Sequence, residues 1–206
     1  MANTITILRF PLLVVVVLML YSSSPLTRLI TVPLSGLLIG MDMLDGLVAR
    51  ARKEVSLMGS VLDIMADRTV ELVLWICFAH LGQIPVAIPI IYVMRGTVVD
   101  SLRSMHVGAG KAPFKAMRTG PGKFLVASPP MRTGYALSKL ISFAGLALTY
   151  ALAAYAARGT VTWQTVRLSS LVFSVTSWIS VALCLVRGLP VIIEALPFLQ
   201  EPVEPA

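Results

Sequence analysis

The sequence predicts an all-α integral membrane protein with six transmembrane helices and a polar active-site cavity near the cytoplasmic face. Two observations support this fold class. Of the 206 residues, 57% are hydrophobic and only 13% are charged, whereas soluble domains carry about 25% charged residues. In addition, six apolar stretches are long enough to cross a bilayer, and segments rich in Gly, Pro or Ser separate them.

The predicted spans follow one another along most of the chain. They lie at residues 5–21, 26–49, 57–81, 84–105, 135–156 and 168–186. Turn-forming residues separate them at 22–25, Gly82, 108–130 and 158–160. We expect residues 1–190 to form one transmembrane domain and residues 191–206, which contain three prolines, to form a short tail.

The charge distribution predicts the orientation. The formal net charge is +7, and a cytoplasmic N-terminus would place most loop Lys and Arg residues on the inner side, as the positive-inside rule requires. The sequence therefore predicts a multi-pass protein of the cell (inner) membrane whose cations face anionic lipid headgroups. Nucleic acid is not an expected partner, because no basic stripe is interleaved with exposed aromatic residues. Cys77 and Cys184 lie in apolar stretches and are expected to be core or lipid-facing residues.

Charged residues inside a membrane span are costly and indicate function by default. The second and third predicted spans carry four aspartates. Asp42 and Asp45 are three residues apart, and Asp63 and Asp67 are four apart, so each pair shares one face of its helix. Because the connecting loop is short, we expect the two helices to be antiparallel neighbours with both pairs at a similar depth.

Four carboxylates at one depth require compensation, and no equal set of basic residues is expected at that depth. We therefore predict one or two divalent cations, because all-oxygen ligands favour Mg²⁺, Mn²⁺ or Ca²⁺ over Zn²⁺. Small residues nearby leave room for a ligand or a nucleotide; they are Gly46, Ala49, Gly59 and Ser60. Arg50 offers a guanidinium fork to a diphosphate.

Between Asp42 and Asp67 the sequence reads D-x2-D-G-x2-A-R-x8-G-x3-D-x3-D. This segment resembles the full signature of the CDP-alcohol phosphotransferases, with all eight specified positions present. The resemblance implies an enzyme of phospholipid biosynthesis that transfers the phosphatidyl group from CDP-diacylglycerol to an alcohol and releases CMP. It also implies a homodimer and an Mg²⁺ or Mn²⁺ cofactor.

The resemblance assigns roles to the signature residues. Asp67 would be the base that takes the proton of the acceptor hydroxyl. The metal would be held by Asp42, Asp45, Asp63 and Asp67. The CDP pocket would be lined by Gly46, Ala49, Arg50, Gly59 and Ser60.

Basic residues on the later spans indicate the acceptor. Arg95 and Arg103 lie on the fourth span. Arg132, Tyr135 and Lys139 follow i, i+3, i+7 spacing and share one face of the fifth. A pocket with three or four cations suits a phosphorylated alcohol, so these basic residues are the candidates for binding its phosphate.

Resemblances to two groups of family members indicate different acceptor alcohols. The segment from Arg95 to Arg103 is similar to the corresponding part of phosphatidylglycerophosphate synthases, which makes glycerol 3-phosphate the first candidate. Arg68 with Glu71 resembles the inositol-phosphate-using members, so inositol phosphate or another polar alcohol is the alternative acceptor. A divalent-metal transporter and a non-catalytic scaffold are alternatives of other classes, but neither needs the glycines, Arg50 or a basic acceptor face.

Several charged residues also have structural interpretations. Arg9 either extends to the membrane interface or belongs to an N-terminal amphipathic helix similar to that of glycerophosphate- and inositol-phosphate-using members. Lys139 would likewise extend to the interface, and Arg95 and Arg103 would anchor lipid headgroups. Arg68 is expected to pair with Glu71 or Asp100 if it is structural.

Overall fold

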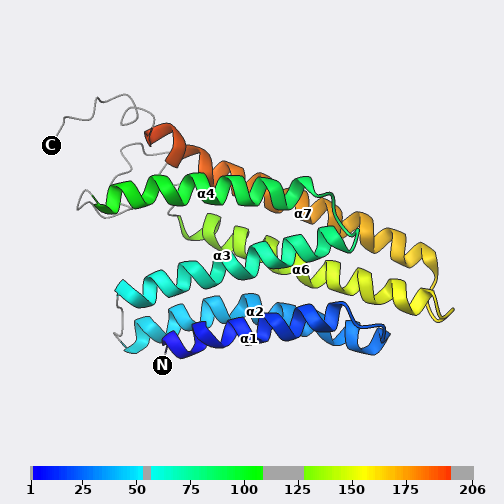
Figure 1. Ribbon diagram of the computed structural model, residues 1–206. Coiled ribbons are helices and arrows are strands. Elements are labelled where there is room, and N and C mark those ends of the chain that lie inside the picture. Colours follow the sequence, from blue (N-terminus) through cyan, green and yellow to red (C-terminus); the bar gives the residue numbers. More distant parts are fainter. Residues whose placement is uncertain (1, 53–56, 109–127, 196–206) are drawn as a thin grey trace.

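The computed structural model describes residues 2–52, 57–108 and 128–195, and this part of the chain is entirely helical apart from its turns. Six helices run side by side along one long axis, and the first residues of α1 and the last residues of α7 lie toward the same end (Figure 1). They are α1 (Ala2–Leu20), α2 (Pro25–Arg52), α3 (Leu57–His80), α4 (Ala87–Gly108), α6 (Pro129–Ala156) and α7 (Trp163–Ala195). The predicted all-α fold class is confirmed.

The helices form two rows. One row contains α1, α3 and α4 in that order, and the other contains α2, α6 and α7. The rows join where α1 packs on α2 and where α4 packs on α7. As expected, α2 and α3 run in opposite directions and touch, but the main neighbours of α2 are α6 and α1 rather than α3.

Aromatic side chains fill the core between the rows. The ring of Trp75 on α3 lies 4.4 Å from Phe143 on α6 and stacks at 5.1 Å on Tyr92 of α4, centroid to centroid. All three are almost completely buried. The Tyr92 hydroxyl shares a hydrogen bond of 2.7 Å with Ser180 Oγ on α7, so its polar end is satisfied. These contacts hold α3, α4, α6 and α7 together.

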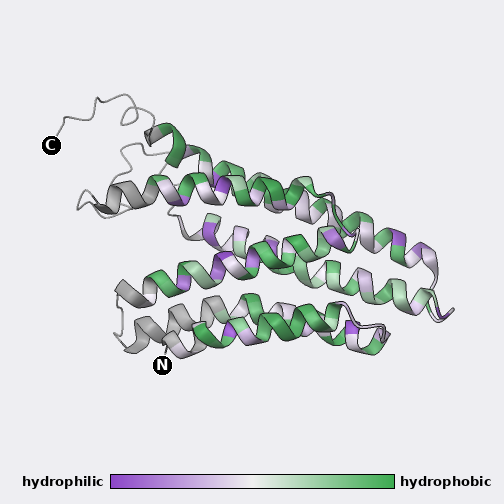
Figure 2. Ribbon diagram, in the orientation of Figure 1, coloured by the Kyte–Doolittle hydropathy of each residue, from purple (hydrophilic) through white to green (hydrophobic). Residues whose placement is uncertain are grey.

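Two helices in the described part are apolar and long enough to cross a membrane, at Pro130–Ala156 and Trp163–Ile193. Shorter apolar helices span Thr6–Leu20 and Pro25–Met41. Hydrophilic residues interrupt α3 and α4 at similar levels (Figure 2). Two of the six described helices therefore meet this criterion, and the prediction of six transmembrane spans stays a prediction.

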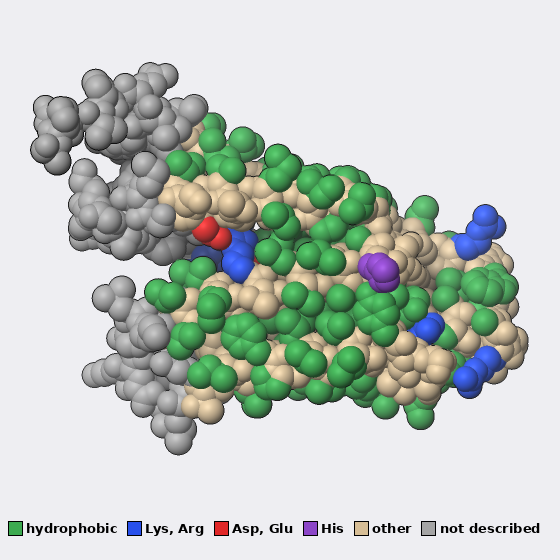
Figure 3. Space-filling model, in the orientation of Figure 1, with side chains coloured by type: hydrophobic (Ala, Val, Ile, Leu, Met, Phe, Trp, Pro, Cys, Tyr) green, Lys and Arg blue, Asp and Glu red, His purple; other side chains and the backbone are tan. Residues whose placement is uncertain are grey.

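The outer surface supports a membrane environment. Large apolar side chains are exposed along every helix, including Leu18, Met94 and Leu171, which are more than 60% accessible. On the face shown in Figure 3, hydrophobic and uncharged atoms predominate, and a small group of acidic and basic side chains lies over α3 and α4. Extended exposed apolar surface of this kind is typical of proteins that contact lipid or partner proteins.

Two helices begin earlier than the apolar pattern predicts. Helix α6 begins at Pro129 rather than at residue 135, because prolines occupy its first positions, where no N–H is required. Helix α7 begins at Trp163 rather than at residue 168, since Thr162 Oγ1 accepts the backbone N–H of Thr165 at 3.4 Å. The predicted break at 108–130 therefore ends in the first turn of α6, and its residues 109–127 lie outside the described part.

The last helix is also longer than predicted. It continues through Pro190 to Ala195 instead of ending at residue 186. The division of the chain at residue 190 stays a prediction, and residues 196–206 lie outside the described part. Two predicted breaks are confirmed, since Gly82 and Gly159 adopt φ values of 70° and 77°, which favour glycine.

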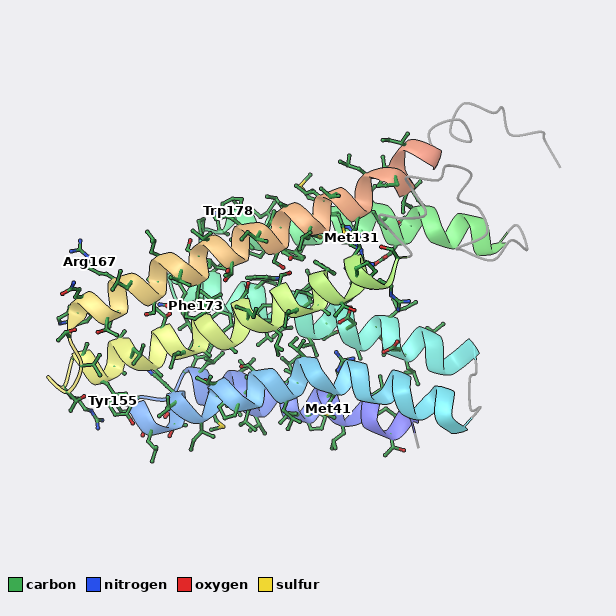
Figure 4. The ribbon with its side chains drawn as sticks, turned by 180° about the vertical axis from the view of Figure 1, so that it is seen from behind. Met41, Met131, Tyr155, Arg167, Phe173 and Trp178 are labelled. Carbon is green, nitrogen blue, oxygen red and sulfur yellow. The ribbon has the colours of Figure 1, made fainter. Side chains whose placement is uncertain are left out.

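A glycine permits close contact between α6 and α7. A Cβ atom at Gly145 would overlap the ring of Phe173, which lies between the two helices (Figure 4). We expect Gly145→Ala to lower the thermal unfolding temperature of the detergent-solubilised protein by several degrees, because overpacking costs about 1–3 kcal/mol. The matched control is Gly134→Ala on the same helix, where nothing lies within 4 Å of the added atom. Equal effects of the two substitutions would refute this interpretation.

Candidate active site

The structure describes only part of the predicted signature site. Five of its residues lie in the C-terminal turns of α2, and their side chains are outside the described part; they are Asp42, Asp45, Gly46, Ala49 and Arg50. Gly59 and Ser60 lie in the first turn of α3, and the side chain of Ser60 is not described. Asp63 and Asp67 follow on α3 with described side chains. The convergence of all four aspartates therefore stays a prediction.

Arg9 of α1 contacts both described aspartates. Its Nη1 lies 3.9 Å from Asp63 Oδ1, and its Nη2 lies 3.8 Å from Asp67 Oδ1. The Arg9 side chain is 0% exposed, so it does not extend to the membrane interface, and that interpretation is wrong. The physical reason is that a buried guanidinium is stabilised by two carboxylates that α3 presents one turn apart.

Lys139 of α6 approaches the same group from the other row. Its Nζ lies 3.6 Å from Asp67 Oδ1 and 3.5 Å from Glu71 Oε1. The side chain is only 7% exposed, so it does not extend to the interface either. The sequence analysis expected no equal set of basic residues at the depth of the four aspartates. The structure places two basic side chains, Arg9 and Lys139, against Asp63 and Asp67. Arg9 and Lys139 belong to helices distant in sequence, and only the fold brings them to α3.

A second ion-pair network continues from Glu71 toward α4. Arg68 Nη1 lies 3.3 Å from Glu71 Oε2, and Arg68 Nε lies 3.0 Å from Asp100 Oδ2. The predicted pairing of Arg68 with Glu71 or Asp100 is confirmed for both partners. The side chains of Arg68 and Asp100 are 21% and 35% exposed, and charged side chains come to the surface over α3 and α4 (Figure 3). Glu71 is buried.

The charges of the described residues are compatible with a bound divalent cation, but these residues alone do not form a complete metal site. Four carboxylates face three cations, which leaves one negative charge in excess; they are Asp63, Asp67, Glu71 and Asp100 against Arg9, Arg68 and Lys139. Asp63 and Asp67 remain 47% and 32% exposed, so both carboxylates keep accessible surface. Such oxygen donors suit Mg²⁺ or Mn²⁺. The described residues alone contain no group of three or more His, Cys, Asp or Glu side chains that would hold a metal.

A basic cluster surrounds Tyr135 at the neighbouring end of α6 and α7. Lys139 Nζ lies 4.7 Å and the Arg187 guanidinium carbon 5.1 Å from the centre of the Tyr135 ring. Arg95 of α4 and Arg132 of α6 are close enough to Arg187 to repel it. Of the four predicted acceptor residues, Lys139 lies beside Tyr135 and Arg95 contacts α7, Arg132 is exposed, and the side chain of Arg103 is outside the described part of α4.

Arg187 was not predicted as a member of this cluster. It follows the last apolar stretch, so the sequence placed it at the membrane surface, and its proximity to Tyr135 arises only because α7 continues past residue 186. Arg95 donates from Nε to the backbone carbonyl of Cys184, at 3.2 Å. A Cβ atom at Gly188 would lie 2.8 Å from Arg95 Nε, so this glycine makes room for the arginine.

Fold and site together define a helical membrane protein with ionised side chains buried where its helices converge. The sequence profile of the CDP-alcohol phosphatidyltransferases matches residues 1–186, and the chain belongs to this family. No individual curated protein matches the chain. Family membership establishes transfer of a phosphatidyl group from a CDP-alcohol, a reaction for which the family generally uses divalent metal ions. It gives no support to the metal-transporter alternative.

Proposed function

We propose that the protein transfers the phosphatidyl group from CDP-diacylglycerol to a phosphorylated alcohol, with glycerol 3-phosphate as the first acceptor, and releases CMP. The observation that carries this proposal is the position of Asp67. This carboxylate belongs to the signature, is partly exposed, and lies between Arg9 and Lys139. We propose further that the protein forms a homodimer in the cell membrane with its site facing the cytoplasm.

The proposed roles follow the chemistry of the side chains. A divalent cation held by Asp42, Asp45, Asp63 and Asp67 would neutralise charge on the diphosphate and on the departing CMP. Asp67 would also accept the proton of the acceptor hydroxyl, because it is the last signature aspartate and the one that contacts Lys139. The guanidinium of Arg9 contacts both Asp63 and Asp67, and these contacts orient the two carboxylates.

The basic cluster around Tyr135 supports a phosphate on the acceptor. Arginine and lysine side chains from three helices converge there, and their mutual repulsion is relieved when an anion binds among them. Asp67 is connected to this cluster through Lys139, so an acceptor phosphate bound there would lie near the proposed base. Inositol phosphate carries the same group and remains the alternative acceptor.

The test is an acceptor panel with the purified protein. CDP-diacylglycerol with Mg²⁺ or Mn²⁺ is incubated with glycerol 3-phosphate, inositol 1-phosphate, serine or inositol, and CMP and the lipid product are quantified. We expect stoichiometric CMP and lipid product with a phosphorylated acceptor, abolished by EDTA. Activity with serine or inositol alone would refute the phosphorylated acceptor, and an absence of CMP with every acceptor would refute the proposed function.

Arg187 is expected to contribute to acceptor binding. Arg187→Ala should raise the KM for the phosphorylated acceptor about tenfold and change the KM for CDP-diacylglycerol much less, because a charged hydrogen bond to phosphate is lost. The matched control is Arg167→Ala, an exposed arginine near the start of the same helix (Figure 4), roughly 30 Å away along the axis. Equal rises in both KM values for Arg187→Ala would contradict the assignment.

A further inference from the structure

Glu71 is a buried carboxylate that contacts three side chains, Arg68, Tyr135 and Lys139. It lies one turn after Asp67 on α3 and is 1% exposed. Its Oε1 accepts the Tyr135 hydroxyl at 2.7 Å and lies 3.5 Å from Lys139 Nζ. Its Oε2 lies 3.3 Å from Arg68 Nη1. Both carboxylate oxygens are therefore engaged, one toward α6 and the other within α3.

The contacts of Glu71 determine where Lys139 lies. Lysine carries a point charge on a flexible four-carbon stem, so its position depends on its partners. The Lys139 nitrogen is nearly equidistant from Glu71 and Asp67, at 3.5 and 3.6 Å. If the charge of Glu71 were removed, the attraction of Asp67 would dominate among these two partners and draw the ammonium toward the proposed base.

The other partners of Glu71 prevent it from moving with Lys139. Arg68 binds the opposite carboxylate oxygen and is itself held by Asp100 of α4 through Nε at 3.0 Å and Nη2 at 3.3 Å. Tyr135 donates to the oxygen that faces Lys139, and its ring lies beside both Lys139 and Arg187. Glu71 thus links an ion-pair network on α3 and α4 to the basic cluster on α6 and α7.

We propose that Glu71 is a positioning residue that holds Lys139 and Tyr135 in the arrangement that binds the phosphate of the acceptor. It acts through these two side chains and contacts neither substrate. This inference rests on the proposed function and identifies the residue that organises its acceptor pocket. Its consequence for binding falls on the acceptor, because the CDP-diacylglycerol pocket is assigned to other residues, and the displacement of Lys139 toward Asp67 would in addition lower the maximal rate.

The test is a double-mutant cycle between Glu71→Gln and Lys139→Met. Glutamine keeps an oxygen that accepts the Tyr135 hydroxyl but removes the charge. Alone, Glu71→Gln is expected to raise the acceptor KM about tenfold with the CDP-diacylglycerol KM within about twofold, since a charge-assisted contact to phosphate is misplaced. In the Lys139→Met background it should add little, because the side chain that it positions is absent.

The outcomes separate positioning from a purely structural role. A structural defect would lower the amount of active protein and the maximal rate without changing the acceptor KM. An unchanged acceptor KM in Glu71→Gln, or rises that multiply in the double variant, would overturn the inference. If Glu71→Gln does not fold, Tyr135→Phe decides: a selective rise in the acceptor KM supports the inference, and an unchanged value overturns it. Wild-type protein inactive with every acceptor would instead refute the proposed function.

Discussion

Asp67→Asn is expected to abolish phosphatidyl transfer while CDP-diacylglycerol still binds. Asparagine has nearly the same size, but its amide cannot accept the proton of the acceptor hydroxyl, and a positioned general base contributes roughly 10²–10⁴-fold to a rate. The measurements are the initial rate of CMP release and the affinity for CDP-diacylglycerol by titration calorimetry. Near-normal CMP release by this variant would refute the assignment of the base.

Asp63→Asn is the matched comparison, because Asp63 lies one turn earlier on α3 and also contacts Arg9. Its proposed role is metal binding alone. We therefore expect raised Mn²⁺ concentrations to restore part of the activity of Asp63→Asn, whereas Asp67→Asn should stay inactive at any Mn²⁺ concentration. Recovery of both variants to the same extent would show that the two aspartates share one role.

Arg9→Met is expected to make the stability of the protein depend on divalent metal. Without the guanidinium, Asp63 and Asp67 lose the cation that they share, and breaking a fully buried pair costs about 3–5 kcal/mol. The partial exposure of the two carboxylates reduces this cost to about 1–3 kcal/mol, or several degrees in the unfolding temperature. Bound Mn²⁺ would replace the missing charge.

The measurement is thermal unfolding of the detergent-solubilised protein in EDTA and in Mn²⁺. The unfolding temperature of Arg9→Met should fall in EDTA, and Mn²⁺ should raise it more than it raises that of the wild type. Arg9→Lys is the control, since it keeps the charge. An equal loss in EDTA and Mn²⁺ would indicate that Arg9 contributes through packing rather than through the charge it supplies to the aspartates.

Sequence periodicity predicted the helices well where apolar residues form their boundaries and less well where they do not. Helices α6 and α7 begin earlier than predicted because prolines start α6 and Thr162 caps α7. A search for apolar residues does not detect these local start signals. The continuation of α7 through Pro190 was also missed. That extension brings Arg187 beside Tyr135, so an error in one boundary concealed a candidate acceptor residue.

The sequence by itself determined the all-helical fold and the spacing of the signature aspartates, because composition, periodicity and motif spacing are local properties, and the family chemistry was implied by the resemblance of its signature. Only the tertiary structure decided which charged side chains form ion pairs. Arg9, Lys139 and Asp100 come from three helices, and each finds its partner on α3. The spacing of residues within one helix carries no information about which side chains of another helix face it, and the energy of a buried charge depends on that pairing.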